Sequence, residues 1–144
     1  ETYVDRGGLL VLANSAFRLK YGNEPLDPNE DWPDMNAVAE RFGIRYGEGG
    51  LASTIAYTIE GSPLVEGVEA LELIAGNSLP FSLEGAAKSQ ELAQADGGPA
   101  AALVDHGLSG GQILILADLG ILGAAWGPPA NLAFWRNLAR YARE

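Results

Sequence analysis

The chain has 144 residues, enough for one domain with a sizeable core. Nine basic residues against nineteen acidic residues give a formal net charge of -10, which argues against nucleic acid and anionic membrane surfaces as partners. There is no cysteine, which excludes disulfides, thiolate metal sites and a cysteine nucleophile. No apolar run approaches the roughly 20 residues of a membrane-spanning helix, so we predict no direct membrane insertion by this segment. The composition leaves the cellular compartment open.

The first predicted elements are a strand and a helix separated by a long polar loop. The continuous aliphatic run from Leu9 to Ala13 is typical of a strand covered on both faces. The helix is expected to begin at Asp31 as its cap, with Pro33 in the first turn and apolar residues spaced at i, i+3, i+4 and i+7 from Met35. Gly43 then provides its C-terminal stop.

The middle of the chain predicts several short strands, at residues 44–50, 53–60, 70–76, 87–96 and 99–107. The stretch 53–60, "STIAYTIE", has the alternation of a half-exposed ribbon. The glycine-rich turn from His106 to Gly111 predicts that the strands on either side are antiparallel neighbours. A second buried strand follows at 112–118, and a helix with one apolar stripe closes the chain from Asn131 to Arg143.

One phrase occurs twice, as "GGLLVLAN" (7–14) and "GGQILILAD" (110–118). Each copy is an aliphatic strand followed, after a loop, by a helix that begins near an asparagine. A buried strand that leads into a covering helix is the α/β unit. We therefore predict a single α/β domain over residues 1–144, with a mixed central sheet and an antiparallel, β-rich middle.

Five segments resemble those of a known family in their order along the chain. They are "YVDRGGLLVLAN", "NAVAERFGIRY", "SPLVEGVEALEL", "GGQILILADLGIL" and "NLAFWRNLARY". The chain resembles class I glutamine-amidotransferase-like domains, and within them an uncharacterised branch without amidotransferase activity. That branch is related to auxiliary domains of gliding-motility ABC transport systems and to intraflagellar transport proteins.

The resemblance implies a flavodoxin-like three-layer sandwich. It also implies truncation at the N-terminus, because the family has a strand and a helix before "YVDRGG"; either the domain was cut or another chain completes the sheet. The chain begins with Glu1, and we expect it to be a piece of a longer protein. The family's catalytic triad is Cys–His–Glu, so the absence of cysteine excludes glutamine amidotransferase activity.

The candidate binding residues follow the two aliphatic strands. If these strands run parallel near the middle of the sheet, Asn14, Ser15 and Asp118 emerge at the edge where α/β proteins bind ligands. They would present an amide, a hydroxyl and a carboxylate to a small polar ligand, with Arg18 as a charge partner and Trp126 as an exposed stacking side chain. Alternatively, Asn14 and Asp118 cap the loops that follow them by accepting hydrogen bonds from backbone amides.

Three other motifs suggest chemistry that their surroundings do not favour. "GLSGG" matches the G-x-S-x-G hydrolase pattern, but a strand and not a helix follows it, so Ser109 and His106 are predicted to be hairpin residues. "DPNED" begins like a calcium loop but has Trp32 and Val38 where that loop needs glycine and glutamate. The three arginines of the last helix are expected to form a solvated face. We predict no metal and no cofactor.

These observations and the resemblance lead to one expected function and two alternatives. The expected function is a non-catalytic, amidotransferase-like binding or assembly domain of a larger protein, which in that family is often membrane-associated. One alternative is a sugar- or metabolite-binding domain at the strand-end edge, and the other is a carboxylate-dependent hydrolase that uses Asp118 with Ser15. The expected partners are another protein, a second copy of the chain or a small polar ligand.

Overall fold

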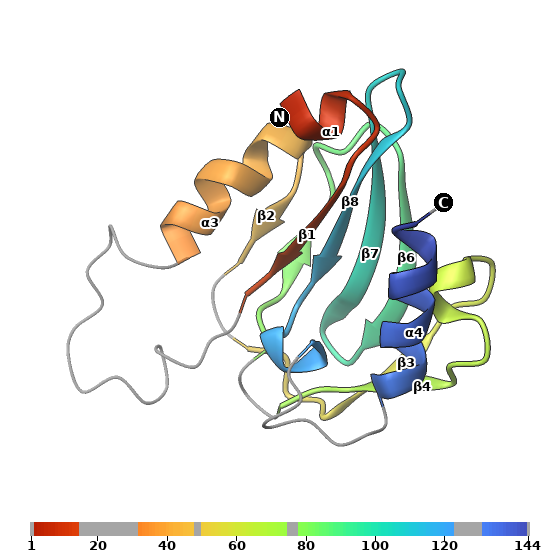
Figure 1. Cartoon of the computed structure of the whole chain (residues 1–144). Helices are drawn as coiled ribbons and strands as arrows, with labels where there is room; N and C mark the ends of the chain where they lie inside the picture. The colour runs from red at the N-terminus through yellow and green to blue at the C-terminus, as the bar shows by residue number, and fades with distance from the viewer. Residues whose placement is uncertain (1, 15–31, 48–49, 75–77, 123–130, 144) are drawn as a thin grey trace.

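The computed structural model describes residues 2–14, 32–47, 50–74, 78–122 and 131–143, and shows a mixed α/β fold (Figure 1). Its main sheet has six strands in the order β1-β8-β7-β6-β3-β4, and β2 and β5 form a separate two-stranded sheet. The β1–β8 pair is parallel and every other pair is antiparallel. The strands are β1 (Leu9–Ala13), β2 (Arg45–Tyr46), β3 (Ile55–Thr58), β4 (Ala70–Glu72), β5 (Phe81–Ser82), β6 (Ser89–Ala95), β7 (Gly98–His106) and β8 (Gly111–Leu116).

Few helices accompany the sheets in the described part of the chain. The α-helices are α1 (Thr2–Asp5), α3 (Trp32–Ala39) and α4 (Leu132–Tyr141), and the 3-10 helices are η1 (Glu40–Phe42), η2 (Pro63–Val65) and η3 (Leu119–Ile121). Within the described residues, no helix combines the length and the apolar character needed to cross a membrane.

The two copies of the duplicated phrase lie side by side, as the strand-end site requires, but only β8 lies in the interior of the described sheet. β1 and β8 are parallel and in register from Leu9↔Gln112 to Ala13↔Leu116. The burial expected of both strands holds only for β8, whose residues from Ile113 to Leu116 are fully buried. β1 is the outermost strand of the described sheet and is half-buried except at Leu12, because no described strand pairs with its other side.

The predicted strands of the middle region all exist, but most are shorter than expected. Among the described residues of the segment at 44–50, Arg45 and Tyr46 form β2, and the segment at 53–60 contributes the four residues of β3. The antiparallel hairpin predicted around His106–Gly111 is confirmed by the pairing of β7 with β8. The predicted stop at Gly43 is also confirmed, because this residue caps η1 with a φ of 74°.

Two elements carry no sequence signal that predicts them. β5 has only two residues, and α1 has only four, of which Val4 is buried. The helix α1 packs directly on the start of β8: a Cβ atom at Gly111 would lie 1.8 Å from the Val4 carbonyl oxygen. Glycine at this position therefore permits the close approach of α1 to the sheet.

The strand alternation places α4 and η1 on opposite faces of the sheet. Gln112 accepts a hydrogen bond from Tyr141 of α4 and pairs with Asp105 in β7, so these side chains share one face. The next residue, His106, points to the other face, where its ring meets Phe42 of η1 edge to face with centroids 5.0 Å apart. Figure 1 shows α4 along one side of the sheet and α3 with β2 apart from it.

Two asparagines at corresponding places in the duplicated pattern attach a helix to a strand. Asn36 of α3 donates to the Tyr46 carbonyl (3.0 Å) and accepts from the Tyr46 amide (2.8 Å). Asn131, which precedes α4, makes the same pair of bonds with Glu72 at 3.0 and 2.9 Å. Neither is a side-chain cap of the kind common at helix starts: Asn36 lies within α3, and Asn131 makes no capping bond.

The hydroxyl of Tyr46 joins β2 to the ends of the parallel pair. It donates towards the carbonyl oxygens of Leu12 (3.2 Å) and Leu116 (2.9 Å), and the whole residue is buried. Burial raises the pKa of this phenol far above its ordinary value, so the group stays a neutral donor.

Gly43 offers a direct test of the close packing between η1 and the segment before β6. Its φ is 74°, and an added Cβ would lie 2.1 Å from Gly85 backbone atoms, whereas Gly67 has a φ of 68° with nothing within 4 Å. We expect Gly67→Ala to lower the free energy of unfolding by ~1–2 kcal/mol, because alanine is strained in the left-handed backbone conformation. Gly43→Ala should cost an additional ~1–3 kcal/mol through overpacking. Urea unfolding measures both, and equal losses would contradict the close approach of Gly43 to Gly85.

Candidate functional site

The strand-end edge proposed as a ligand site is present, but only part of it lies in the described residues. Asn14 and Asp118 follow β1 and β8 at the same edge of the sheet, and the Leu119 amide donates to the Asn14 carbonyl at 2.9 Å. The other three candidates, Ser15, Arg18 and Trp126, lie outside the described residues.

Asp118 is fully buried, and both of its carboxylate oxygens accept hydrogen bonds from the protein. Oδ1 accepts from the Gly120 amide (2.7 Å), which makes Asp118 the N-cap of η3. Oδ2 accepts from the Ile74 amide (2.6 Å) and the Ser78 hydroxyl (3.1 Å). This is the capping role that the sequence left open, extended to a second segment of the chain.

The G-x-S-x-G motif lies in the β7–β8 hairpin, where its position was predicted. The Ser109 hydroxyl donates to the backbone carbonyl of Asp5, and Nε2 of His106 lies 3.2 Å from the Asp5 carboxylate. The serine thus bonds a peptide oxygen and serves to fix α1 on the hairpin. The DPNED segment lies outside the described residues. Those that are described contain no group of three or more His, Asp or Glu side chains placed to hold one metal ion.

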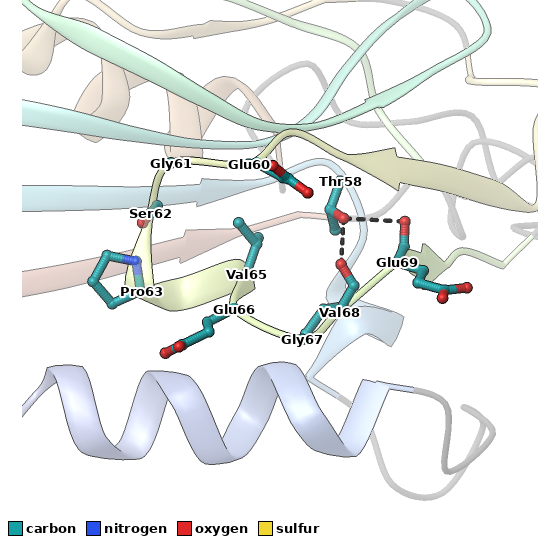
Figure 2. Close-up of a pocket in the computed structure, with 10 residues that line it drawn as sticks. All are labelled: Thr58, Glu60, Gly61, Ser62, Pro63, Val65, Glu66, Gly67, Val68 and Glu69. Atoms are coloured by element: carbon teal, nitrogen blue, oxygen red, sulfur yellow. Dashed lines mark hydrogen bonds between the residues drawn. The ribbon is translucent and has the colours of Figure 1, made fainter.

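A cavity of about 780 Å³ lies between the end of β3 and the segment that carries η2 (Figure 2). Thr58 lines it and donates to the carbonyls of Val68 and Glu69, the latter at 3.0 Å. Its rim carries three exposed glutamates, Glu60, Glu66 and Glu69. Figure 2 shows the side chains of Glu66 and Glu69 pointing away from each other, so they do not converge on one point. The cavity is an acidic hollow without a converging set of catalytic groups.

The opposite face of β3 and of the residue that follows it carries three large apolar side chains in the open. Ile55, Tyr57 and Ile59 are 42%, 69% and 41% exposed, while the small Ala56 between them is fully buried. Thr58 points to the cavity on the side of α4, where Asn137 donates to the Leu64 and Glu66 carbonyls. The alternation of the strand therefore places the three apolar side chains on the side of the sheet away from α4. We call these three residues the β3 face.

The β3 face lies in a strongly acidic part of the chain. No lysine or arginine occurs between Arg45 and Lys88, and this stretch contains six glutamates. Glu72 of β4 is the cross-strand partner of Ile55, so its side chain borders the face directly. Gln94 of β6 is the partner of Tyr57 and is exposed beside it. The alternation in "STIAYTIE" predicts that these side chains share a face, but it does not predict whether that face is buried or exposed.

A third feature is a chain of polar side chains beside a smaller cavity, of about 250 Å³, at the end of the sheet where β8 begins. Asp105 accepts from Lys88 (2.5 Å) and from Gln112 (2.9 Å), and Gln112 accepts from Tyr141 (2.6 Å). The hydrogen bond from Lys88, with that from Gln112, lowers the pKa of Asp105, and Asp105 in turn raises the pKa of Lys88. Both groups of this ion pair therefore stay charged over a wide range of pH.

No protein-family model and no curated protein sequence matches the chain. Among solved structures it is similar to the β-galactosidase from Rahnella sp. R3, with a TM-score of 0.58 and 17% identity over 99% of this chain and 20% of that one. It is also similar to the exo-β-1,4-mannosidase Op5Man5 from Opitutaceae bacterium strain TAV5, with a TM-score of 0.50 and 16% identity over 98% of this chain and 22% of that one. The chain thus spans about a fifth of the length of each. At this identity the likeness establishes the fold alone.

The role of Asp118 can be tested by Asp118→Asn. The side-chain amide of asparagine has an NH2 group in place of one acceptor oxygen, and this group would face the donors of Gly120, Ile74 or Ser78. We therefore expect the free energy of unfolding to fall by ~2–4 kcal/mol. Thermal and urea unfolding measure it. Asp96→Asn is the matched control, because Asp96 is exposed and makes none of these contacts. An unchanged stability in Asp118→Asn would show that the carboxylate is not a structural cap.

The ion pair of Lys88 and Asp105 predicts a pH dependence of stability. Because folding lowers the pKa of Asp105, its contribution is present above the unfolded-state pKa and is lost as the pH falls through the folded-state pKa. We therefore expect Asp105→Asn to lower the melting temperature slightly at neutral pH, as befits an exposed pair, and to have no effect near pH ~2. Scanning calorimetry across pH measures this difference. A destabilisation that is the same at both ends would assign the effect to packing.

Proposed function

We propose that this chain is a non-catalytic binding or assembly domain of a larger protein. One observation carries the proposal: two much longer proteins contain this fold along almost the whole of this chain, as about a fifth of their own length. Both are named as glycoside hydrolases, a mannosidase and a galactosidase. We infer that the chain accompanies a catalytic domain of a carbohydrate-active protein and does not itself perform the reaction.

The chemistry of the described residues supports a role without catalysis. The one carboxylate proposed for hydrolysis, Asp118, is occupied by three protein donors, and the hydroxyl of Ser109 bonds a backbone carbonyl. The strand-end ligand site and the hydrolase therefore have less support than the assembly role. A surface that suits assembly is present instead, since three large apolar side chains are exposed together on β3 and the residue after it.

The proposal includes a more specific fold class, which depends on the resemblance to amidotransferase-like domains. We infer a flavodoxin-like sandwich of the amidotransferase-like type, in a branch that has lost the catalytic cysteine. The parallel β1–β8 pair, with α4 along one face of the sheet, supports this inference. The absence of cysteine from the chain is the reason for proposing this branch and not a glutamine amidotransferase.

The test separates an accessory domain from an enzyme. The isolated chain, incubated with p-nitrophenyl β-mannoside and β-galactoside, should give the same rate as buffer, and Asp118→Asn should not change that rate. In the longer polypeptide that we propose contains it, deleting residues 1–144 should alter the oligomeric state or melting temperature. Light scattering and calorimetry read out these changes. Turnover by the isolated chain would overturn the proposal, and so would a gene that encodes no further domain.

A further inference from the structure

In β3 the large apolar residues are exposed and the small residue is buried, which is the reverse of the usual arrangement in a strand. In a strand with one covered face, the large apolar residues normally point to the core and the small or polar ones to solvent. Here the buried positions are Ala56 and, in part, Thr58, whereas Ile55, Tyr57 and Ile59 point outward. A single exposed apolar residue needs no explanation, but three neighbouring ones along one extended segment mark an interaction surface.

The cover of this side of the sheet stops before it reaches β3. The elements η1, β2 and β5 lie over the other end of the face, where Phe42 meets His106 and Tyr46 reaches the ends of β1 and β8. In the strand order, β3 is separated from that end by β6 and β7. The outward side of β3, with Glu72 and Gln94 as its direct neighbours, is left uncovered by the described residues.

The negative charge around the β3 face indicates which kind of surface can bind to it. Glu72 borders Ile55, and Glu91 is exposed on the neighbouring strand β6. Between Arg45 and Arg136 the only lysine or arginine is Lys88, and it is paired with Asp105. Two copies joined through the same face would bring like charges together, because a two-fold interface places the same patch on both sides. A basic surface would neutralise them.

We propose that the β3 face docks a basic protein surface, one with aliphatic or aromatic side chains at its centre and lysine or arginine at its rim. The apolar centre would cover Ile55, Tyr57 and Ile59, and the basic rim would meet Glu72 and Glu91. This deepens the proposed function, on which it rests, by naming the chemistry of the partner.

The test uses the whole chain and three synthetic peptides as probes. The first alternates lysine with isoleucine and tyrosine, the second replaces each lysine by glutamate, and the third replaces the apolar residues by serine. Binding is followed by fluorescence anisotropy, and ¹⁵N amide shifts locate the contact. We expect shifts confined to β3, β4 and β6 with the first peptide, and affinities about tenfold or more weaker for the other two. Raising NaCl from about 50 to about 300 mM should weaken the first.

Two sets of variants assign the binding to this face. The double variant Ile55→Ser with Tyr57→Ser removes the apolar centre, and Glu72→Lys with Glu91→Lys reverses the rim; each should weaken the first peptide about tenfold. Leu108→Ser is the control, because Leu108 is fully exposed at the tip of the β7–β8 hairpin, away from β3. Melting temperatures show whether the variants fold. If the double serine variant does not fold, the double lysine variant still tests the proposal.

Three results would overturn the inference. One is equal binding of the first and second peptides, one is binding that Leu108→Ser weakens as much as the face variants do, and one is amide shifts that map elsewhere. A concentration-dependent dimer in sedimentation velocity that Tyr57→Ser abolishes would also overturn it, in favour of a second copy. None of these results bears on turnover, so they leave the proposed accessory role to its own test.

Discussion

The parallel pairing of β1 with β8 is the constraint on which the rest of this structure depends. It joins the two aliphatic segments from opposite ends of the chain, and every element from α3 to β7 lies in the loop that this pairing closes. Closing so long a loop costs chain entropy, which the fully buried residues of β8 offset by apolar burial. The Tyr46 hydroxyl then fixes the carboxyl ends of both strands to β2.

A buried carboxylate secures the same edge of the sheet. Asp118 caps the start of η3 and also accepts hydrogen bonds from Ile74 and Ser78, which lie about forty residues earlier in the chain. A carboxyl group removed from water is tolerated only when its oxygens accept hydrogen bonds, and three donors serve that purpose here. The position at which open α/β sheets commonly bind ligands is therefore used, at this residue, to hold the fold together.

The sequence predicts those parts of the fold that depend on local pattern. The aliphatic runs, the glycine turn before β8 and the stop at Gly43 follow from burial and backbone geometry, and each is found. The short α1 and β5 could not be predicted, because their formation depends on contacts with distant segments, as that of Val4 with Gly111 shows. The role of Asp118 was equally out of reach. An aspartate after a strand suits a ligand or a cap, and only the distant Ile74 and Ser78 decide between them.

The β3 face shows why alternation alone does not say which side of a strand is buried. The pattern of Ile55, Tyr57 and Ile59 fixes that these side chains share a face, but the choice of face depends on which elements cover the sheet. The other side of β3 faces the segment that carries η2 and lies near α4. The buried Ala56 points there, beside its cross-strand partner Leu71, so the residues that alternate with Ala56 point the opposite way. The large side chains are thus directed to the side that the described residues leave open. Since the same region has many glutamates and no arginine, its cover must supply both apolar contact and positive charge.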